Sequence, residues 1–159
     1  MAVANVVVLP DGSWPSKDAL DDVTGRGVPV FSPELADLPA DLPPPLADSR
    51  RVALIAQWVK RNVPIGAVVW VAHGDTARLL PGLAFAQRAA HRTVVGYVLV
   101  DAVSPAPSLE WPDAPVTWIR TSEAADEVGQ GALSAELRGF RVSATADLAG
   151  VIQTVATIG

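Results

Sequence analysis

Ala67-Val-Val-Trp-Val-Ala72, followed at once by His73-Gly74-Asp75-Thr76, is the stretch that decides the fold. Its first six residues are apolar without alternation, which is typical of a strand buried on both faces of a parallel sheet. Val6-Val-Val-Leu9 and Thr93-Val-Val-Gly-Tyr-Val-Leu-Val100 are two further runs of the same kind. Three shorter strand candidates bring the count to about six: Val28–Phe31, Val116–Ile119 and Phe140–Ser143.

Helices are expected between these strands. A helix from Asp48 or Ser49 to Asn62 has apolar residues at the spacing of one helical face. Thr76–Ala90 is also predicted to be helical, with a bend or a fresh start at Pro81-Gly82. Shorter helical segments are expected at Lys17–Val23, at Glu123–Leu137 with a break at Gly129-Gln-Gly131, and from Asp147 onward. This alternation predicts an α/β fold with a doubly wound, mostly parallel sheet of about six strands and helices on both faces.

Pro33–Pro45 holds five of the 14 prolines. Proline lacks the backbone donor and fixes φ, so this segment cannot be a central strand or the interior of a helix. We interpret it as an ordered surface loop rather than a linker, since too little chain precedes it to fold alone. Residues 1–159 are therefore predicted to form a single domain.

Composition excludes several classes of function. The absence of cysteine removes disulfides, thiolate catalysis and cysteine-ligated metals, and two histidines leave little for a metal centre. The net charge of −5 argues against nucleic-acid partners, which need a basic face. No apolar run approaches the roughly 20 residues that span a bilayer, and the start lacks the features of a secretory signal. We expect a cytoplasmic protein with no cofactor, no metal and no membrane partner.

The candidate site lies where two strands end. In an open parallel sheet, ligands bind beyond the carboxyl ends of the strands, where the strand order reverses. The simplest doubly wound order places the loop Pro10-Asp-Gly-Ser-Trp14 beside the loop His73–Thr76. The predicted catalytic residues are Asp11, His73 and Asp75, and the predicted ligand-binding residues are Gly12, Ser13, Trp14, Gly74 and Thr76. The predicted partner is a small-molecule ligand.

Structural roles are open for the same residues. Asp11 and Ser13 are also ordinary turn residues, and Asp75 could cap the following helix. His73 could be a hydrogen-bonded structural histidine. The remaining polar and aromatic candidates are expected to be structural: His91 at a helix end, Asp101 bracing a turn, and Trp111 and Trp118 in packing.

Several segments taken together resemble the α/β-hydrolase superfamily. Val69-Trp-Val-Ala-His73-Gly74-Asp75-Thr-Ala-Arg-Leu-Leu-Pro81 resembles the nucleophile elbow, in which a strand runs through Gly-His-Ser-x-Gly into a helix. Val6-Val-Val-Leu-Pro10-Asp-Gly12-Ser-Trp14 looks like the His-Gly oxyanion loop. Val95–Ala102 resembles the next strand, and Asp113–Ile119 resembles the strand before the catalytic acid. The resemblance spans most of the chain and is greatest to small, lidless members, so it implies a truncated fold of this kind.

The chain departs from the family pattern at the catalytic positions. Gly74 stands where the resemblance implies the nucleophilic serine. Ser143-Ala-Thr-Ala-Asp147-Leu matches the stretch that should supply the base, and it has no histidine. Glu123 and Asp126 are the nearest carboxylates to the acid position. Because the serine and the histidine are both missing from these positions, ordinary serine hydrolysis is not expected. An aspartate nucleophile at Asp75 would lie one residue past the elbow, and a shift of one residue on a sharp turn redirects the side chain.

Three hypotheses follow. The first is a divergent α/β-hydrolase-like protein that binds a small apolar carbonyl ligand and is either a pseudoenzyme or a catalyst of lyase, isomerase or cyclase type. Such chemistry needs acid–base groups and oriented donors but no covalent intermediate. The second is a non-catalytic scaffold, which leaves a homo-oligomer open. The third is a hydrolase with a non-standard site.

Overall fold

The structure, a computed structural model, describes residues 2–12, 14–34, 38, 41–105, 108, 110–121, 133–145 and 147–158. Its main sheet has six strands in the order β3-β2-β4-β5-β6-β7, and every neighbouring pair is parallel. The strands are β2 (Asn5–Val8), β3 (Val30–Phe31), β4 (Val68–His73), β5 (Val94–Val100), β6 (Val116–Arg120) and β7 (Arg141–Ala144). The predicted α/β class and the predicted parallel sheet of about six strands are confirmed.

The strand order reverses between β2 and β4. The chain passes from β2 outward to β3, and then returns to the other side of β2 to form β4. In register, Val7 pairs with Trp70, and Trp70 pairs with Tyr97 on β5. Since parallel strands end at the same edge, the loops after β2 and β4 are neighbours, as the sequence predicted.

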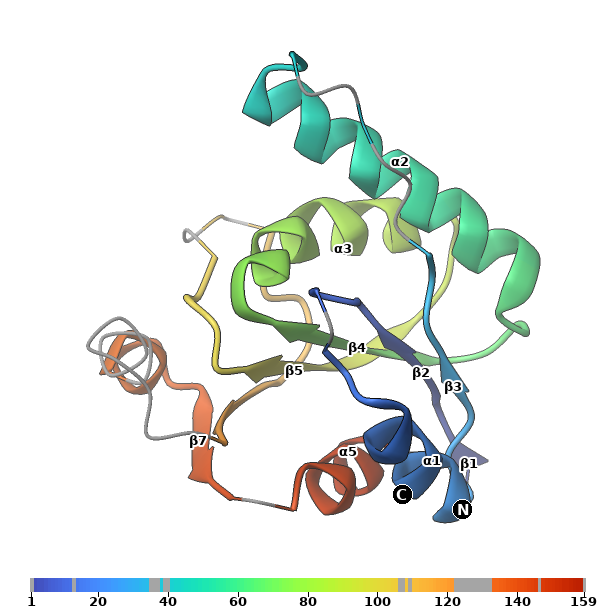
Figure 1. Cartoon of the computed structure of the whole chain (residues 1–159), viewed down its shortest axis with the longest axis vertical. Coiled ribbons are helices and arrows are strands. Elements are labelled where there is room, and N and C mark those ends of the chain that lie inside the picture. The colour runs from blue at the N-terminus through green and yellow to red at the C-terminus, as the bar shows by residue number, and fades with distance from the viewer. Residues whose placement is uncertain are drawn as a thin grey trace.

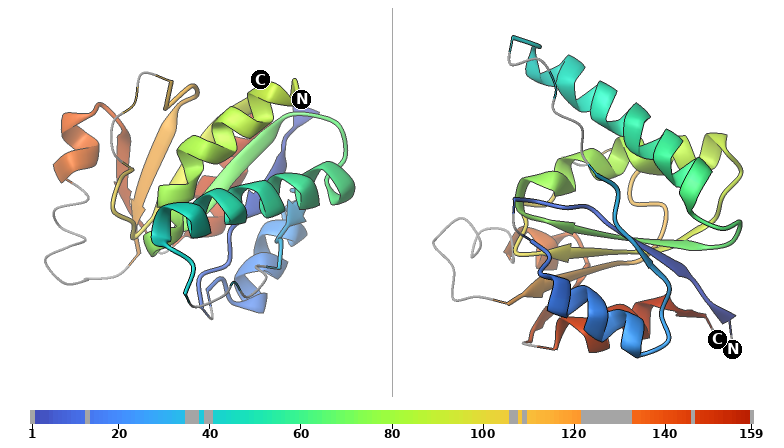
Figure 2. Two further views of the ribbon diagram at one scale, coloured as in Figure 1. Left: turned by 90° about the horizontal axis from the view of Figure 1, so that it is seen from above. Right: turned by 45° about the vertical axis from the view of Figure 1, so that its right-hand side comes forward.

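Helices cover both faces of this sheet. Figures 1 and 2 show α2 and α3 on one face and α1 and α5 on the other. Their bounds are α1 (Lys17–Gly25), α2 (Pro44–Asn62), α3 (Leu80–Ala89) and α5 (Leu148–Ala156), and the 3₁₀ helix η1 (Gly74–Leu79) joins β4 to α3. Residues 133–137 are also helical. Helix α3 begins at Leu80–Pro81, so the predicted interruption there is a fresh start.

The sheet separates two hydrophobic cores. Val68, Trp70 and Ala72 of β4 point to the layer of α2 and α3, where Ile55 and Leu83 are buried. The alternate residues Val69 and Val71 point to the layer of α1 and α5, where Val23 and Ile152 are buried. Burial on both faces explains why the strands are apolar throughout.

Two features differ from the expectations or add to them. Helix α2 starts at Pro44 with Pro43 as its N-cap, whereas the predicted N-cap was Asp48 or Ser49. The prediction was wrong because proline is well suited to the first turn of a helix, where its missing N–H has no intrahelical partner. The structure also pairs β1 (Ala2–Val3) with β8 (Thr157–Ile158) in an antiparallel ribbon, so the two ends of the chain lie together (Figure 1).

No helix within the described residues has both the length and the apolar character that a bilayer crossing requires.

Candidate functional site

The turn after β4 is built around Gly74. The strand ends at His73, Gly74 has φ of +55°, and η1 follows directly. A positive φ is costly for a residue with a Cβ atom. A Cβ atom at this position would also lie 2.6 Å from Oδ2 of Asp11. The sharp strand-to-helix turn is therefore present, and the space above its tip is occupied by a carboxylate.

Asp11 and His73 form a hydrogen-bonded pair across the neighbouring strands β2 and β4. Nδ1 of His73 lies 2.9 Å from Oδ2 of Asp11, and the two side chains are 26% and 37% exposed. Trp14 stacks on the imidazole with ring centroids 4.7 Å apart and an angle of 16° between the planes. The pair is thus accessible to solvent, and one face of the His73 ring is covered by Trp14.

The loop after β2 is a tight turn that holds Asp11 in place. Asp11 and Trp14 exchange both of their backbone hydrogen bonds, each 2.9 Å long. Gly12 lies between them with φ of +59° and is exposed. Ser13, the third predicted binding residue of this loop, lies outside the described residues. The turn therefore fixes Asp11 and Trp14 together against the histidine.

This arrangement suits proton transfer. When Nδ1 carries its proton and donates it to the Asp11 carboxylate, Nε2 of His73 is left with a free lone pair. An acceptor carboxylate of this kind fixes the tautomer and orientation of an imidazole and stabilises its protonated form. The pair therefore has the parts of a general base.

The other two predicted residues of the second loop have different surroundings. The hydroxyl of Thr76 donates to the carbonyl of His73 at 2.8 Å and accepts from its backbone N–H at 3.2 Å, and the residue is only 7% exposed. Thr76 thus stabilises the turn. Asp75 is exposed, and in the described part of the chain its carboxylate accepts no hydrogen bond, so it does not cap η1.

The carboxyl ends of the remaining strands carry structural contacts. Asp101, with φ of +45°, accepts hydrogen bonds from the backbone N–H (2.9 Å) and the hydroxyl of Thr121, so it links the ends of β5 and β6. Asp147, in the stretch that matches the base of the hydrolases, caps α5 through Gly150 N at 3.0 Å and pairs with Arg26 at 3.1 Å. Glu123 and Asp126 lie outside the described residues.

The residues expected to be structural occupy such positions. His91 follows α3 in a left-handed conformation, with φ of +56°, and is exposed. Trp111 and Trp118 are buried, and Nε1 of Trp118 donates to the carbonyl of Ala102 at 2.8 Å. The prediction that both tryptophans serve packing is confirmed. Within the described residues, no group of three histidine, aspartate or glutamate side chains is placed to hold a metal ion.

Comparison with solved structures identifies the fold. A protein of the α/β-hydrolase superfamily from Xanthomonas campestris pv. campestris is 18% identical, covers 97% of this chain and 94% of its own length, and superposes with a TM-score of 0.61. An extracellular α/β-hydrolase from a Paenibacillus species is 11% identical over 95% of this chain and 97% of its own, with a TM-score of 0.64. The NocB thioesterase domain is 13% identical over 98% and 92%, with a TM-score of 0.59.

This chain has the α/β-hydrolase fold. The agreement covers nearly the whole of this chain and of each of the three solved structures, so the fold is matched as a unit. No protein-family model matches the sequence. No curated protein matches it either. The α/β-hydrolase resemblance stated from the sequence is therefore confirmed for the fold.

The direct bond between Asp11 and His73 was not foreseen, although both residues were predicted site residues. They are 62 positions apart, and only the adjacency of β2 and β4 brings them together. The signal that could have found the bond is that each residue comes within two positions of the end of an apolar run, Val6–Leu9 or Ala67–Ala72. Val8 pairs with Val71, so Asp11 and His73 extend beyond the last paired residues at the same edge.

Proposed function

We propose that this protein binds a small apolar carbonyl compound at the ends of β2 and β4 and transfers protons on it, rather than hydrolysing it through a serine. The observation that carries the proposal is the Asp11–His73 hydrogen bond of 2.9 Å beside a turn whose tip, Gly74, has no side chain. The position that presents the nucleophile in the nucleophile elbow offers none here.

In the proposed reaction, Nε2 of His73 takes a proton from the carbon next to the carbonyl group. The electron pair of the broken C–H bond moves into an enolate, and Asp11 stabilises the imidazolium that forms. The imidazolium then returns the proton to carbon or oxygen, which completes an isomerisation and regenerates the base. Asp75 is the second proposed acid–base group. The ligand-binding site is proposed to be lined by Gly12, Trp14 and Gly74.

Solvent exchange tests this step without knowledge of the natural ligand. Cyclohexanone is incubated with the protein in deuterium oxide, and the loss of its α-proton signals is followed by nuclear magnetic resonance. We expect exchange above the buffer rate, because one general base contributes about 10²–10⁴-fold. His73→Gln is expected to abolish the enhancement and Asp11→Asn to reduce it.

The chain offers a matched control. His91→Gln removes the only other histidine, which lies at the end of α3, and is expected to leave the exchange rate unchanged. Circular dichroism of each variant shows whether the fold is intact. Exchange at the buffer rate, or equal exchange rates for the unchanged protein and the His73→Gln variant, would contradict the proposal.

Ester hydrolysis at a non-standard site is a second candidate, because several structural relatives are esterases or thioesterases. Asp75 would then be the nucleophile, one residue beyond the tip of the turn. p-Nitrophenyl acetate tests this directly. Turnover that disappears in Asp75→Asn and survives in His73→Gln would favour hydrolysis, whereas equal rates with and without protein would dismiss it.

A further inference from the structure

A second hollow lies between α2 and α3, which we call the α2–α3 groove. It has a volume of about 1090 Å³ and is open to solvent. Its walls come from α2 between Arg50 and Arg61, from the last turn of α3, and from Ile65 and Arg92. Ile65 and Arg92 stand just before β4 and β5. The groove therefore reaches the edge at which the strands begin, and Asp11 and His73 lie at the opposite edge.

The charge of the α2–α3 groove is opposite to that of the whole chain. None of the described residues that line it is an aspartate or a glutamate, whereas the chain has a net charge of −5. Four cationic residues line it: Arg50, Lys60, Arg61 and Arg92. Among the described residues, Arg50, Lys60 and Arg61 have no carboxylate within ion-pair distance. A concave surface with unopposed positive charge attracts an anion.

Arg92 differs from the other cations because it makes hydrogen bonds to the protein backbone. Its guanidinium donates to the carbonyls of Val63 at 3.2 Å and Pro64 at 3.0 Å, so it closes the end of the groove. Burial lowers its pKa from the ordinary value of arginine. The cations free to meet a ligand are therefore those of α2.

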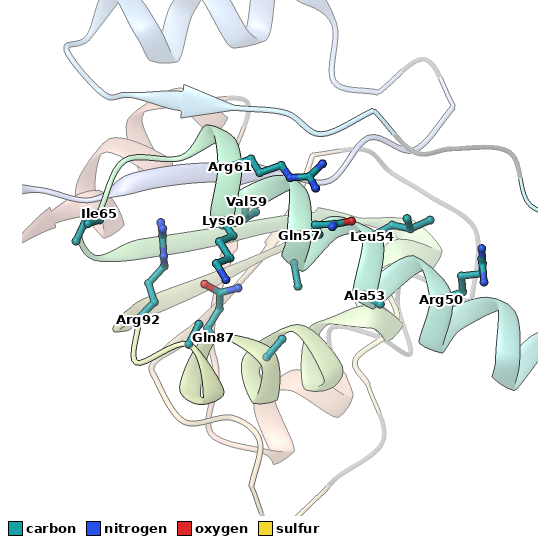
Figure 3. Close-up of a pocket in the computed structure, with 13 residues that line it drawn as sticks. Arg50, Ala53, Leu54, Gln57, Val59, Lys60, Arg61, Ile65, Gln87 and Arg92 are labelled. Carbon is teal, nitrogen blue, oxygen red and sulfur yellow. The ribbon is translucent and has the colours of Figure 1, made fainter.

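Gln87 gives the groove a specific polar contact. The residue is 3% exposed, and its Oε1 atom is fully buried without a hydrogen-bond partner. A buried carbonyl without a donor is unfavourable, and most such groups in proteins are satisfied. Figure 3 shows Lys60 reaching from α2 towards the Gln87 amide on α3, whereas Arg61 points away from it. One cation and one amide thus converge in the groove.

The rest of the lining is apolar and suits a narrow chain. The apolar residues that line it are mostly small: Ala53, Leu54, Ala56, Val59, Ile65, Ala86 and Ala90. Ile65 is fully exposed. A volume near the upper end of small-molecule sites, apolar walls and a few convergent polar groups are the usual features of a ligand pocket.

We propose that the α2–α3 groove binds a small amphiphilic anion. Its anionic group lies against the ammonium group of Lys60, a neighbouring N–H or O–H donates to the Gln87 carbonyl, and its apolar chain covers the alanines and Ile65. The occupant is a free small molecule rather than a membrane or a second copy of the chain, because the recognition elements lie inside the groove. This proposal does not depend on the chemistry proposed for Asp11 and His73.

N-octanoylglycine is a probe with all three features, and calorimetric titration measures its binding to the intact protein. Its methyl ester lacks the charge, and N-octanoylsarcosine lacks the N–H donor. We expect the ester to bind about tenfold more weakly, since a charge-assisted hydrogen bond is lost. We expect the sarcosine analogue to bind about fivefold more weakly, since one neutral hydrogen bond is lost.

Variants locate the site. Lys60→Gln is expected to weaken binding of N-octanoylglycine about tenfold. The matched control Lys17→Gln removes an equal charge from α1, on the opposite face of the sheet and outside the groove, and is expected to change the affinity less than about twofold. Gln87→Met is expected to abolish the difference between N-octanoylglycine and its sarcosine analogue. If Gln87→Met does not fold, the two ligands are compared on the unchanged protein alone.

Four results would overturn the proposal: no binding of N-octanoylglycine, equal affinity for the ester, equal losses in Lys60→Gln and Lys17→Gln, or unchanged discrimination by Gln87→Met. Vesicles with anionic lipid and light scattering over a range of protein concentrations complete the test. Vesicle binding that does not compete with the probe, or self-association that blocks it, would assign the groove to a membrane or to a second copy.

Discussion

Gly12 and Gly74 have nearly the same backbone conformation, with φ of +59° and +55°, but different surroundings. A Cβ atom at Gly12 would meet nothing within 4 Å, whereas one at Gly74 would meet Oδ2 of Asp11 at 2.6 Å. Gly12→Ala should therefore cost only the left-handed conformation, about 1–2 kcal/mol of unfolding free energy. Gly74→Ala should cost about 1–3 kcal/mol more, because the carboxylate must move. Urea denaturation of both variants measures the difference.

The Asp11→Ala background shows whether the carboxylate is the cause. Without the Asp11 side chain, nothing blocks a Cβ atom at Gly74, so Gly74→Ala and Gly12→Ala should then have similar costs. A double-mutant comparison isolates this coupling because the two residues are in direct contact. An extra cost at Gly74 that persists in the Asp11→Ala background would place the strain in the backbone instead.

Tyr97 is the only tyrosine in the chain, so its ionisation can be followed without interference from another phenol. It is fully buried, and its hydroxyl donates to Oδ1 of Asp113 at 2.5 Å. Burial, followed by this hydrogen bond and the charge of Asp113, raises the pKa of Tyr97 well above its ordinary value. The native protein should therefore show no tyrosinate absorption at pH values somewhat above 10, where an exposed tyrosine would be largely ionised.

The same shift affects stability. The folded state keeps the phenol proton that the unfolded chain loses above a pH of about 10, so the contribution of Tyr97 is complete below that pH and declines above it. Tyr97→Phe should make the fall of stability with rising pH less steep. Tyrosinate absorption that rises while circular dichroism remains native, with a midpoint near 10, would refute the argument.

At the site, the sequence predicted the identity of the residues better than their contacts. Asp11, Trp14 and His73 follow apolar strands, and this pattern alone marks the edge where they meet. The bond of Asp11 to His73 and the stacking of Trp14 on His73 depend on which strands are neighbours and on the shape of a four-residue turn. Thr76 was predicted to bind the ligand, whereas its hydroxyl makes hydrogen bonds to the backbone of His73. No pattern in the local sequence distinguishes a side chain that contacts a ligand from one that bonds to the protein itself.

At the scale of elements, the packing of α5 against the sheet depends on a glycine in β5. A Cβ atom at Gly96 would lie 2.8 Å from Cγ1 of Val155. Gly96→Ala should therefore push α5 away from the sheet and lower the unfolding free energy by about 1–3 kcal/mol. In a Val155→Ala background the contact is relieved, and the cost of Gly96→Ala should fall. Equal costs in the two backgrounds, measured by urea denaturation, would mean that β5 itself resists the side chain.

The sequence predicted the long apolar elements well and the short ones poorly. Burial on both faces gives β2, β4 and β5 a continuous apolar pattern that no loop shares. The two-residue strands β1 and β8 carry no such pattern, because only their pairing with each other defines them. Prolines at 44 and 45 concealed the first turn of α2, since the same residues favour a loop and a helix start.

The α2–α3 groove could not be found from the sequence for a related reason. Lys60 and Gln87 are on different helices, and only the packing of α2 against α3 brings them to one cavity. The net charge of −5 argued against a basic surface, but an average over the whole chain conceals a local cluster. Within α2, the adjacent cations Lys60 and Arg61 were the available signal.

At the scale of the whole molecule, one sheet serves two cores, and this has a consequence for unfolding. Residues of β4 alternate between the core under α2 and α3 and the core under α1 and α5, so neither layer can detach without exposing the sheet. The described residues should therefore unfold as one cooperative unit, as the prediction of a single domain requires. In calorimetry, the measured enthalpy should equal the van't Hoff enthalpy.

Two substitutions in opposite layers test this cooperativity. Leu83→Ala on α3 and Ile152→Ala on α5 each remove a buried side chain from a different core and should each cost about 2–5 kcal/mol. Because both cores share the strands, each variant should shift a single transition in which circular dichroism and tryptophan fluorescence coincide. If Ile152→Ala lowered the stability of only one of two separate transitions, the layer of α1 and α5 would be an independent unit, and the sheet would not couple the two cores.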